Sequence, residues 1–309
     1  KVRRGLDQSR QTRNELHAVL KQPGGVQELL NQPARWQAQI KSARADWQRA
    51  SDHAEAAVDP QWTNQLQEQD KELARDQADF ELAQLLEKIR LDTATLVEGK
   101  FDYARAEPKY LAAFETAGLV IAPGRQSEVA RLIQQSPIKD QLLAALDHWA
   151  WVAYRNNHPE LSGQLLEVAR GADSNPWRDQ VRDISLWQRG PAMEKLAEEV
   201  RADREFLARL SPQMLILVFH GLPARNSEEA WLRMAQALHP ADFCINFWLD
   251  RILSDNGKAA DAVGFFRVAL AIRPNNANVY SNLGFSLRKT QDLPGAIDAY
   301  HRALALDPQ

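Results

Sequence analysis

The chain has 309 residues, 44% hydrophobic content and a formal net charge of -3. This near-neutral balance gives no global reason to expect nucleic acid or an anionic membrane as a partner. The single cysteine, Cys244, excludes an internal disulfide, and the longest apolar run, Met214 to Phe219, is too short to cross a bilayer.

The first part of the chain, residues 1–98, is rich in Gln, Arg, Glu, Ala and Asp with widely spaced Leu. This composition is typical of long amphipathic helices. Pro-Gly-Gly at 23–25 separates a first helix from a second, expected over about 26–57. Asp-Pro at 59–60 then separates the second helix from a third, expected over about 61–97.

Charge divides this first part into two halves. Residues 1–50 hold 10 Lys or Arg and 4 Asp or Glu, net +6, whereas residues 51–98 hold 4 and 12, net -8. We expect the helices to fold back on one another as an antiparallel spacer. The stripe of Leu66, Leu73 and Phe80 leaves a coiled-coil dimer open as the alternative.

The middle part, residues 99–208, is predicted to be a degenerate helical-repeat region. Ala106, Tyr110 and Ala113 have a small-aromatic-small order with spacings of four and three. Pro108 between them counts against a continuous helix, because proline lacks the backbone N–H.

The last part, residues 209–309, carries a repeat of 34 residues. The matching pairs are Ala262 and Ala296, Phe266 and Tyr300, Ala269 and Ala303, and Pro274 and Pro308. Ala235 and Pro240 extend the series one unit upstream. The period predicts three units, over about 209–242, 243–276 and 277–309.

This order of residues resembles the second half of a tetratricopeptide repeat, a helix pair that stacks on its neighbours. In the last unit, Gly284 permits close helix approach, Tyr300 fills the gap, and Pro308 ends the pair. The predicted fold class is therefore all-α, with long N-terminal helices followed by an α-solenoid of degenerate and regular repeats. Stacking leaves the last face uncovered, so we expect the parent protein to continue past Gln309, and the initial Lys1 suggests that sequence also precedes it.

The concave face of such an array, lined by the first helix of each pair, is the predicted binding surface for a protein or peptide. The candidate residues are Asn278, Ser281, Asn282, Phe285 and Arg288 in the last unit, and Phe247 and Arg251, with Cys244 and Trp248, in the unit before. Asn282 suits a peptide backbone, and the arginines suit a carboxylate. Each of these side chains is alternatively ordinary surface or core.

Catalytic and metal motifs are weak in this sequence. The seven histidines are scattered without metal-ligand spacing, so neither a metal nor a cofactor is expected. Asp147 and His148 look like a catalytic pair, yet no serine elbow accompanies them, and the neighbouring Trp149 and Trp151 suit helix packing.

Four further stretches carry a second resemblance: Ile89 to Asp102, Ser136 to Trp149, Leu165 to Asp183, and His239 to Trp248. They resemble the region after the catalytic domain in planctomycete-type bacterial serine/threonine protein kinases. In that family a kinase domain, in some members with a membrane segment, precedes helical material and tetratricopeptide repeats. No kinase motif occurs in this chain, so the resemblance transfers no catalytic residue.

The sequence therefore predicts a non-catalytic region that recruits a substrate or partner for an upstream kinase. A freestanding repeat adaptor or assembly factor is the first alternative, and a hydrolase using Asp147 and His148 is the second. We expect a protein or peptide partner, no nucleic acid and no direct membrane insertion, and we leave oligomerisation open. The expected location is the cytoplasm, with membrane tethering through an upstream segment as the other option.

Overall fold

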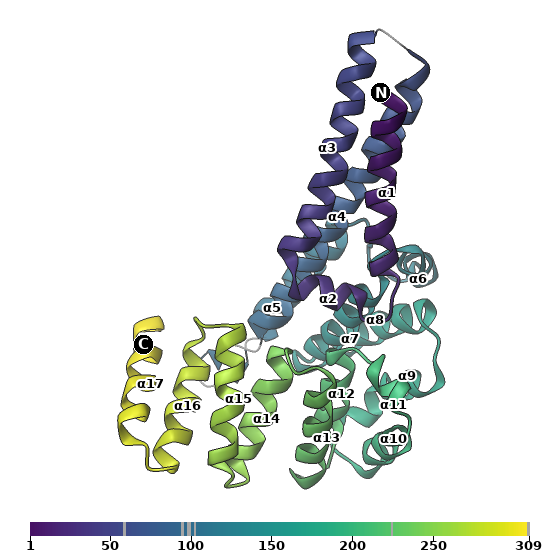
Figure 1. Ribbon diagram of the computed structural model, residues 1–309. Coiled ribbons are helices and arrows are strands. Elements are labelled where there is room, and N and C mark those ends of the chain that lie inside the picture. Colours follow the sequence, from purple (N-terminus) through teal and green to yellow (C-terminus); the bar gives the residue numbers. More distant parts are fainter. Residues whose placement is uncertain (58–59, 94–95, 98–99, 102, 224, 308–309) are drawn as a thin grey trace. The chain divides into compact units, whose positions relative to one another are not determined.

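The chain is helical over most of its length (Figure 1). The computed structural model describes residues 1–57, 60–93, 96–97, 100–101, 103–223 and 225–307. Two short strands, β1 (Leu96–Val97) and β2 (Lys100–Phe101), pair antiparallel, with Leu96 opposite Phe101. The predicted all-α class is confirmed. Contacts divide the chain into two compact units, which are described separately.

The first unit combines Lys1–Lys88 with Tyr110–Leu143. The helices that contribute to it are α1 (Val2–Leu20), α2 (Gly25–Asn31), α3 (Pro33–Ala57), most of α4 (Thr63–Thr93), the second half of α5 (Tyr103–Thr116) and α6 (Gln126–Gln135), with a 3-10 turn, η1 (Pro60–Trp62). Helix α1 packs along α3. The rings of Trp36 and Phe80 meet edge to face at 5.3 Å, which joins α3 to α4.

Opposite charges connect α4 to α1 and α3, in agreement with the predicted attraction between the basic and acidic halves. Arg13 on α1 places Nη1 3.0 Å from Glu72 Oε2 and Nε 2.6 Å from Asp76 Oδ2. Arg44 on α3 pairs with Asp70. The basic and acidic halves of 1–98 thus meet within one unit.

The second predicted helix, 26–57, is in fact two helices. Helix α2 ends at Asn31 and α3 begins at Pro33, with Gln32 between them at φ -128° and ψ 58°. The physical reason is Pro33, because a proline disfavours helical backbone in the residue before it. Asp59, part of the next predicted break, lies outside the described residues.

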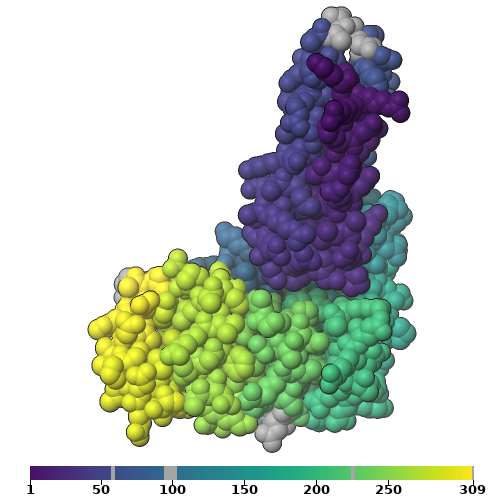
Figure 2. All heavy atoms as spheres, in the orientation of Figure 1, coloured from purple at the N-terminus to yellow at the C-terminus, as the bar shows by residue number. Residues whose placement is uncertain are grey.

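The second unit combines Ile89–Lys109 with Ala144–Gln309. Its further elements are α7 (Lys139–Arg155, which begins in the first unit), α8 (Pro159–Ala172), α9 (Pro176–Val181), η2 (Ile184–Trp187), α10 (Pro191–Arg201), α11 (Arg204–Ala208), α12 (Pro212–Gly221), α13 (Arg225–Leu238), α14 (Phe243–Asp255), α15 (Ala259–Ile272), α16 (Ala277–Lys289) and α17 (Leu293–Leu306). Figure 2 shows α14 to α17 as adjacent bands from green to yellow.

The three units predicted from the 34-residue period each hold one helix pair: α12 with α13, α14 with α15, and α16 with α17. The first helix of each pair begins after a side-chain cap, supplied by Ser211, Asp242 and Asn276 in turn. At Gly284 a Cβ atom would lie 2.9 Å from the Tyr300 ring. The glycine therefore permits the close approach of α16 and α17 that was expected.

The turns inside the α14–α15 and α16–α17 pairs recur in the degenerate region. Gly257 and Gln291, 34 residues apart, have φ of 80° and 65°, and Asn157 between α7 and α8 has φ 62°. After each of them the next N–H donates to a carbonyl five residues back, at 2.8 to 2.9 Å. Helices α7 and α8 thus form a pair of the same design.

Two proline predictions have different outcomes. Helix α5 continues through Pro108, with Ala106, Tyr110 and Ala113 all buried along it. Pro308, expected to end the last pair, lies outside the described residues. The predicted division into 1–98, 99–208 and 209–309 stays a prediction. The two compact units interleave along the chain and therefore describe a different kind of division.

The last helix leaves apolar side chains uncovered, as stacking predicts. Leu293, Ile297 and Leu304 on α17 are each more than half exposed, whereas Ala259, which precedes Leu293 by one repeat period, is buried on α15. Among the described residues, no helix has the length and apolar character needed to span a membrane.

Candidate functional site

Helix α16 carries five of the predicted binding residues. Ser281, Phe285 and Arg288 are exposed, and Asn278 and Asn282 are half-buried. Their spacing of three and four residues places them along one side of the helix. The structure therefore brings them together at the surface of α16, and their binding role stays a prediction.

Helix α14 divides its predicted residues between surface and core. Arg251 is exposed and Trp248 is half-buried. Phe247 is fully buried, stacked on Phe243 at 6.0 Å, and Cys244 is 7% exposed. The reason is that α14 packs against α12, α13, α15 and α16, so only one narrow side reaches solvent. Phe247 does not present its ring to a ligand.

Aromatic contacts link α7, α12 and α14, each the first helix of its pair. Trp187 of η2 lies 5.7 Å from Trp151 of α7, which stacks on His220 of α12 at 4.3 Å. The His220 ring then lies 5.2 Å from Trp248 of α14. Helix α14 is in turn joined to α16 by a 2.8 Å hydrogen bond between two buried serine hydroxyls. We call the surface carried by α7, α12, α14 and α16 the first-helix face.

Three arginines on this face lie over aromatic rings, a set that we call the arginine-aromatic row. Its pairs are Arg155 over Trp151 at 5.5 Å, Arg251 over Trp248 at 5.6 Å, and Arg288 over Phe285 at 5.5 Å. All three guanidinium groups are exposed, and none has an ion-pair partner within the part of the chain that the structure describes. Their charges are thus available to an anionic group.

A cavity of about 30 Å³ opens within the same face and is called here the histidine pocket. It has room for one or two water-sized groups. It is lined by Arg90 and Thr93 from α4, Tyr103 from α5, His148 and Trp151 from α7, Gln213, Ile216 and His220 from α12, and Cys244 and Trp248 from α14.

The two histidines of the pocket are neutral. Burial lowers the pKa of His148 to about 3, helped by the Arg90 charge, and burial with the Arg155 charge lowers that of His220 to about 3. The Thr93 hydroxyl lies 3.3 Å from Nε2 of His148. Because neither imidazole carries a charge at neutral pH, the cations around the pocket are arginines.

One acid near the pocket is already neutralised by a buried partner. Arg90 Nη2 lies 2.8 Å from Asp242 Oδ2, with both side chains only 4% exposed. This pair joins the end of α4 to the start of α14 inside the second unit. Asp242 also accepts from Ile245 N as the cap of α14.

Asp147 and His148 do not form the catalytic pair that the sequence suggested. Asp147 accepts from Arg182 Nε at 2.7 Å and from its Nη2 at 3.0 Å, deep in the core. Arg182 also reaches the carbonyl of Asp173, and the Asp173 side chain binds Arg178 at 2.9 Å. Asp147 is thus a structural anchor between α7 and the segment after α9.

No cluster of three or more His, Cys, Asp or Glu side chains suited to a metal ion occurs among the described residues. The pocket itself was not apparent from the sequence. Its lining comes from segments far apart in the chain. The sequence singled out four of its residues, His148, Trp151, Cys244 and Trp248, but for other reasons. The Asn157-His158-Pro159 turn would have revealed the α7–α8 pair, because it aligns with the later turn at Gly257.

Comparison with known proteins gives short or distant similarities. A peroxisomal targeting signal receptor of Eremothecium gossypii is 36% identical over 80 residues, which are 26% of this chain and 14% of the receptor. The same receptor of Kluyveromyces lactis is 35% identical over 78 residues, 25% of this chain and 14% of the receptor. The chain thus matches only a small part of these relatives' length.

Among solved structures, MamA from Desulfovibrio magneticus is similar with 16% identity and a TM-score of 0.37, over 60% of this chain and 98% of that one. YrrB, described as a TPR protein with an unusual peptide-binding site, has 17% identity and a TM-score of 0.36, over 65% and 93%. Residues 277–309, the last predicted unit, match the family model of the tetratricopeptide repeat.

Proposed function

We propose that this chain is a non-catalytic interaction module that captures a peptide segment of a partner protein on its first-helix face. The observation that carries the proposal is the arginine-aromatic row. Each exposed guanidinium lies on an aromatic ring and keeps its hydrogen-bond donors unpaired, so each offers an apolar and a polar contact together. The repeat match at 277–309 supports the same role.

The curated relatives support a polypeptide ligand. By their name, the peroxisomal proteins are receptors for a targeting signal, and the similarity spans 80 and 78 residues of this chain, longer than two 34-residue repeats. The half-buried Asn282 lies on α16, the helix that also carries Arg288, and its amide can bind a peptide backbone through its donor and its acceptor.

Selection of displayed peptides on the immobilised chain tests this function. We expect enriched peptides that bind the chain and lose binding to the double variant Asn282→Ala with Arg288→Ala. Arg267→Gln, an exposed arginine on α15, serves as the control and should bind like the unmodified chain. Peptides that bind all three proteins equally would place the site elsewhere, and a selection without enrichment would contradict peptide capture.

We further propose that the captured partner is presented, in the cytoplasm, to a serine/threonine kinase encoded upstream. The four stretches that resemble the post-catalytic region of planctomycete-type kinases support this assignment. Reading the coding sequence upstream of Lys1 tests it directly. Kinase motifs there, and phosphorylation of the selected peptide by the longer protein, are the expected results. A reading frame without them would make the chain a freestanding adaptor or assembly factor.

A further inference from the structure

Two exposed arginines of the first-helix face, Arg155 and Arg251, have no ion-pair partner among the described residues. Asp242, the cap of α14, is paired with Arg90, and Asp250 on α14 is buried, with a pKa that burial raises well above its ordinary value. An anionic ligand seated here therefore meets two exposed cations.

Both cations lie close to the histidine pocket. Each covers a ring that lines it, since Arg155 lies over Trp151 and also 5.4 Å from the Tyr103 ring, and Arg251 lies over Trp248. Burial raises the pKa of the Tyr103 hydroxyl, and the charges of the two arginines oppose that rise. Both guanidinium groups thus act on the same pocket lining.

The pocket also contains an acceptor without a donor. Gln213 is 5% exposed, and its Oε1 atom has no hydrogen-bond partner among the described residues. A buried carbonyl oxygen left without a donor destabilises the fold, and a ligand N–H can remove that penalty. The cavity of about 30 Å³ is too small to enclose a cofactor, so it suits one group of a ligand that lies along the face.

We propose that the partner segment is an acidic peptide, whose backbone N–H donates to Gln213 in the histidine pocket and whose Asp or Glu side chains pair with Arg155 and Arg251. This inference rests on the proposed peptide capture and adds the chemistry of the ligand. A run of acidic side chains matches the arginine-aromatic row better than one terminal carboxylate, because the row continues to Arg288 on α16.

Fluorescence anisotropy with two labelled peptides tests the inference on the full chain. One peptide alternates Glu with Ala and Phe, and the other carries isosteric Gln at each Glu. We expect the Glu peptide to bind about tenfold more tightly for each arginine it pairs with. Arg155→Gln and Arg251→Gln should each remove about that factor for the Glu peptide only, with Arg267→Gln unchanged.

Gln213→Met, nearly isosteric and without an amide, separates the two contacts. It should weaken both peptides by the same factor, because the backbone N–H is common to them. Thermal unfolding of every variant verifies that the fold is retained. A loss confined to one peptide, or no loss, would show that Gln213 is only a core residue and would overturn its assigned role.

Equal affinity for the two peptides would overturn the acidic preference and leave peptide capture intact. No binding of either peptide would also overturn it, whereas peptide capture itself stands or falls with the displayed-peptide selection. Binding of heparin with the same dependence on Arg155 and Arg251 would show a surface for polyanions in general and would overturn the assignment to a peptide.

Discussion

At the scale of single residues, the second unit contains a buried carboxyl without compensation. Asp250 on α14 is fully buried, and neither of its oxygens has a hydrogen-bond partner in the described part of the chain. Burial raises its pKa well above 3.8, although the backbone and the charge of Arg251 oppose the rise. One repeat later the equivalent residue is Gly284, which has no side chain and therefore buries no charge. Asp250 thus costs stability where the neighbouring repeat does not.

Replacing Asp250 by Asn should therefore stabilise the chain at neutral pH. The raised pKa in the folded state means that the folded chain holds a proton that the unfolded chain releases above pH 3.8. The contribution of the Asp250 carboxyl to the free energy of unfolding is fully present below pH 3.8. It is lost as the pH rises from there to the folded-state pKa. The advantage of Asp250→Asn should grow by about 1.4 kcal/mol per pH unit over this window.

Urea unfolding of both proteins between pH 3.5 and pH 7, chosen to bracket the ordinary value of about 3.8, measures this difference. Asp298→Asn, at an exposed carboxylate on α17, is a matched control that should show no comparable trend. A constant difference between Asp250→Asn and the unmodified chain across this range would mean that Asp250 is ionised in the folded state.

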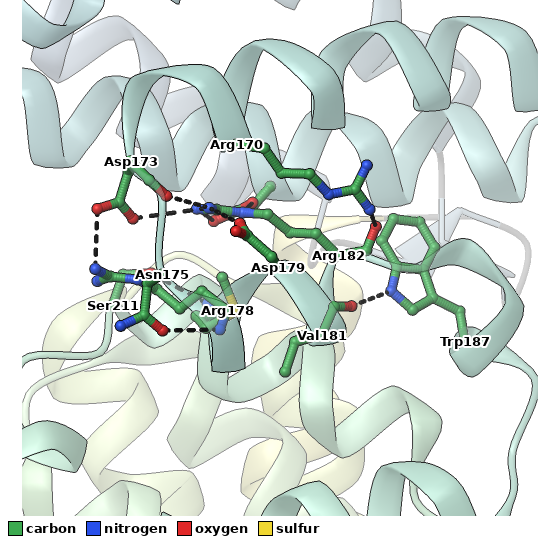
Figure 3. A network of polar contacts seen from close by, with 11 residues as sticks. Arg170, Asp173, Asn175, Arg178, Asp179, Val181, Arg182, Trp187 and Ser211 are labelled. Atoms are coloured by element: carbon green, nitrogen blue, oxygen red, sulfur yellow. Dashed lines mark hydrogen bonds and ion pairs between the residues drawn. The ribbon is translucent and has the colours of Figure 1, made fainter.

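Arg182 is also a buried ionisable group but, unlike Asp250, it has several hydrogen-bond partners. Its side chain is 1% exposed, with one hydrogen bond to the Asp173 carbonyl and with Asp179 within 3.8 Å (Figure 3). Two further hydrogen bonds run to Asp147. Arg170 also donates to its backbone carbonyl. A buried ion is tolerable when its donors are satisfied, so this cluster fixes α7, α8 and α9 relative to one another.

At the scale of helices, two glycines test how closely the elements approach. Gly264 on α15 would have no atom within 4 Å of an added Cβ, whereas Gly284 would contact the Tyr300 ring at 2.9 Å. Gly264→Ala should raise the free energy of unfolding by about 0.5–1 kcal/mol, because alanine favours helix. Gly284→Val should lower it by about 1–3 kcal/mol through overpacking.

Thermal unfolding of the two variants measures both effects, and each serves as the control for the other. If Gly284→Val were as stable as Gly264→Ala, α16 and α17 would not be in close contact. The related variant Ala303→Trp tests the same interface less sharply, since Ala303 is only half-buried on the last helix.

The sequence predicted the regular pairs because their small and aromatic residues recur at a fixed distance. It did not predict the α7–α8 pair, where Ser162, Leu166 and Ala169 occupy the places that Ala262, Phe266 and Ala269 hold later. Without the aromatic residue the pattern is too common to recognise. The Ser162 hydroxyl compensates by donating to the carbonyl of Ala150 at 2.9 Å, a contact between the two helices.

The candidate site was partly predictable for a similar reason. The exposed residues of α16 followed from the helical period alone, as did Arg251. The burial of Phe247 did not, because it depends on the helices that enclose α14 on both sides. The histidine pocket is formed by residues from α4, α5, α7, α12 and α14. A local sequence pattern does not predict contacts between segments so far apart in the chain.

At the scale of the whole chain, the compact units do not follow the order of the sequence. Tyr110–Leu143 belongs with Lys1–Lys88, and Ile89–Lys109 belongs with Ala144–Gln309. The chain therefore passes between the units three times. A boundary at residue 98, which composition suggested, separates residues that pack in the same unit, including the buried Tyr110 and Phe114 on α5.

Two fragments cut at this boundary, 1–98 and 99–309, should therefore reassociate when they are expressed together. Each fragment alone lacks part of the first unit, and the second would expose buried side chains of 110–143, such as Val129 and Ile133. Recovering that buried apolar surface favours complex formation. Affinity purification through a tag on 1–98, followed by sedimentation, should give a complex with one copy of each fragment.

The control pair carries Val129→Asp with Ile133→Asp on α6, which replaces fully buried apolar residues by charges and should abolish copurification.

The same sedimentation experiment distinguishes the coiled-coil alternative. If Leu66, Leu73 and Phe80 form an intermolecular stripe, fragment 1–98 should dimerise alone and ignore 99–309. In the structure Leu73 and Phe80 are already buried in an intramolecular core. Because that core occupies the stripe, we expect complementation between the fragments, with the stripe unavailable to a second copy.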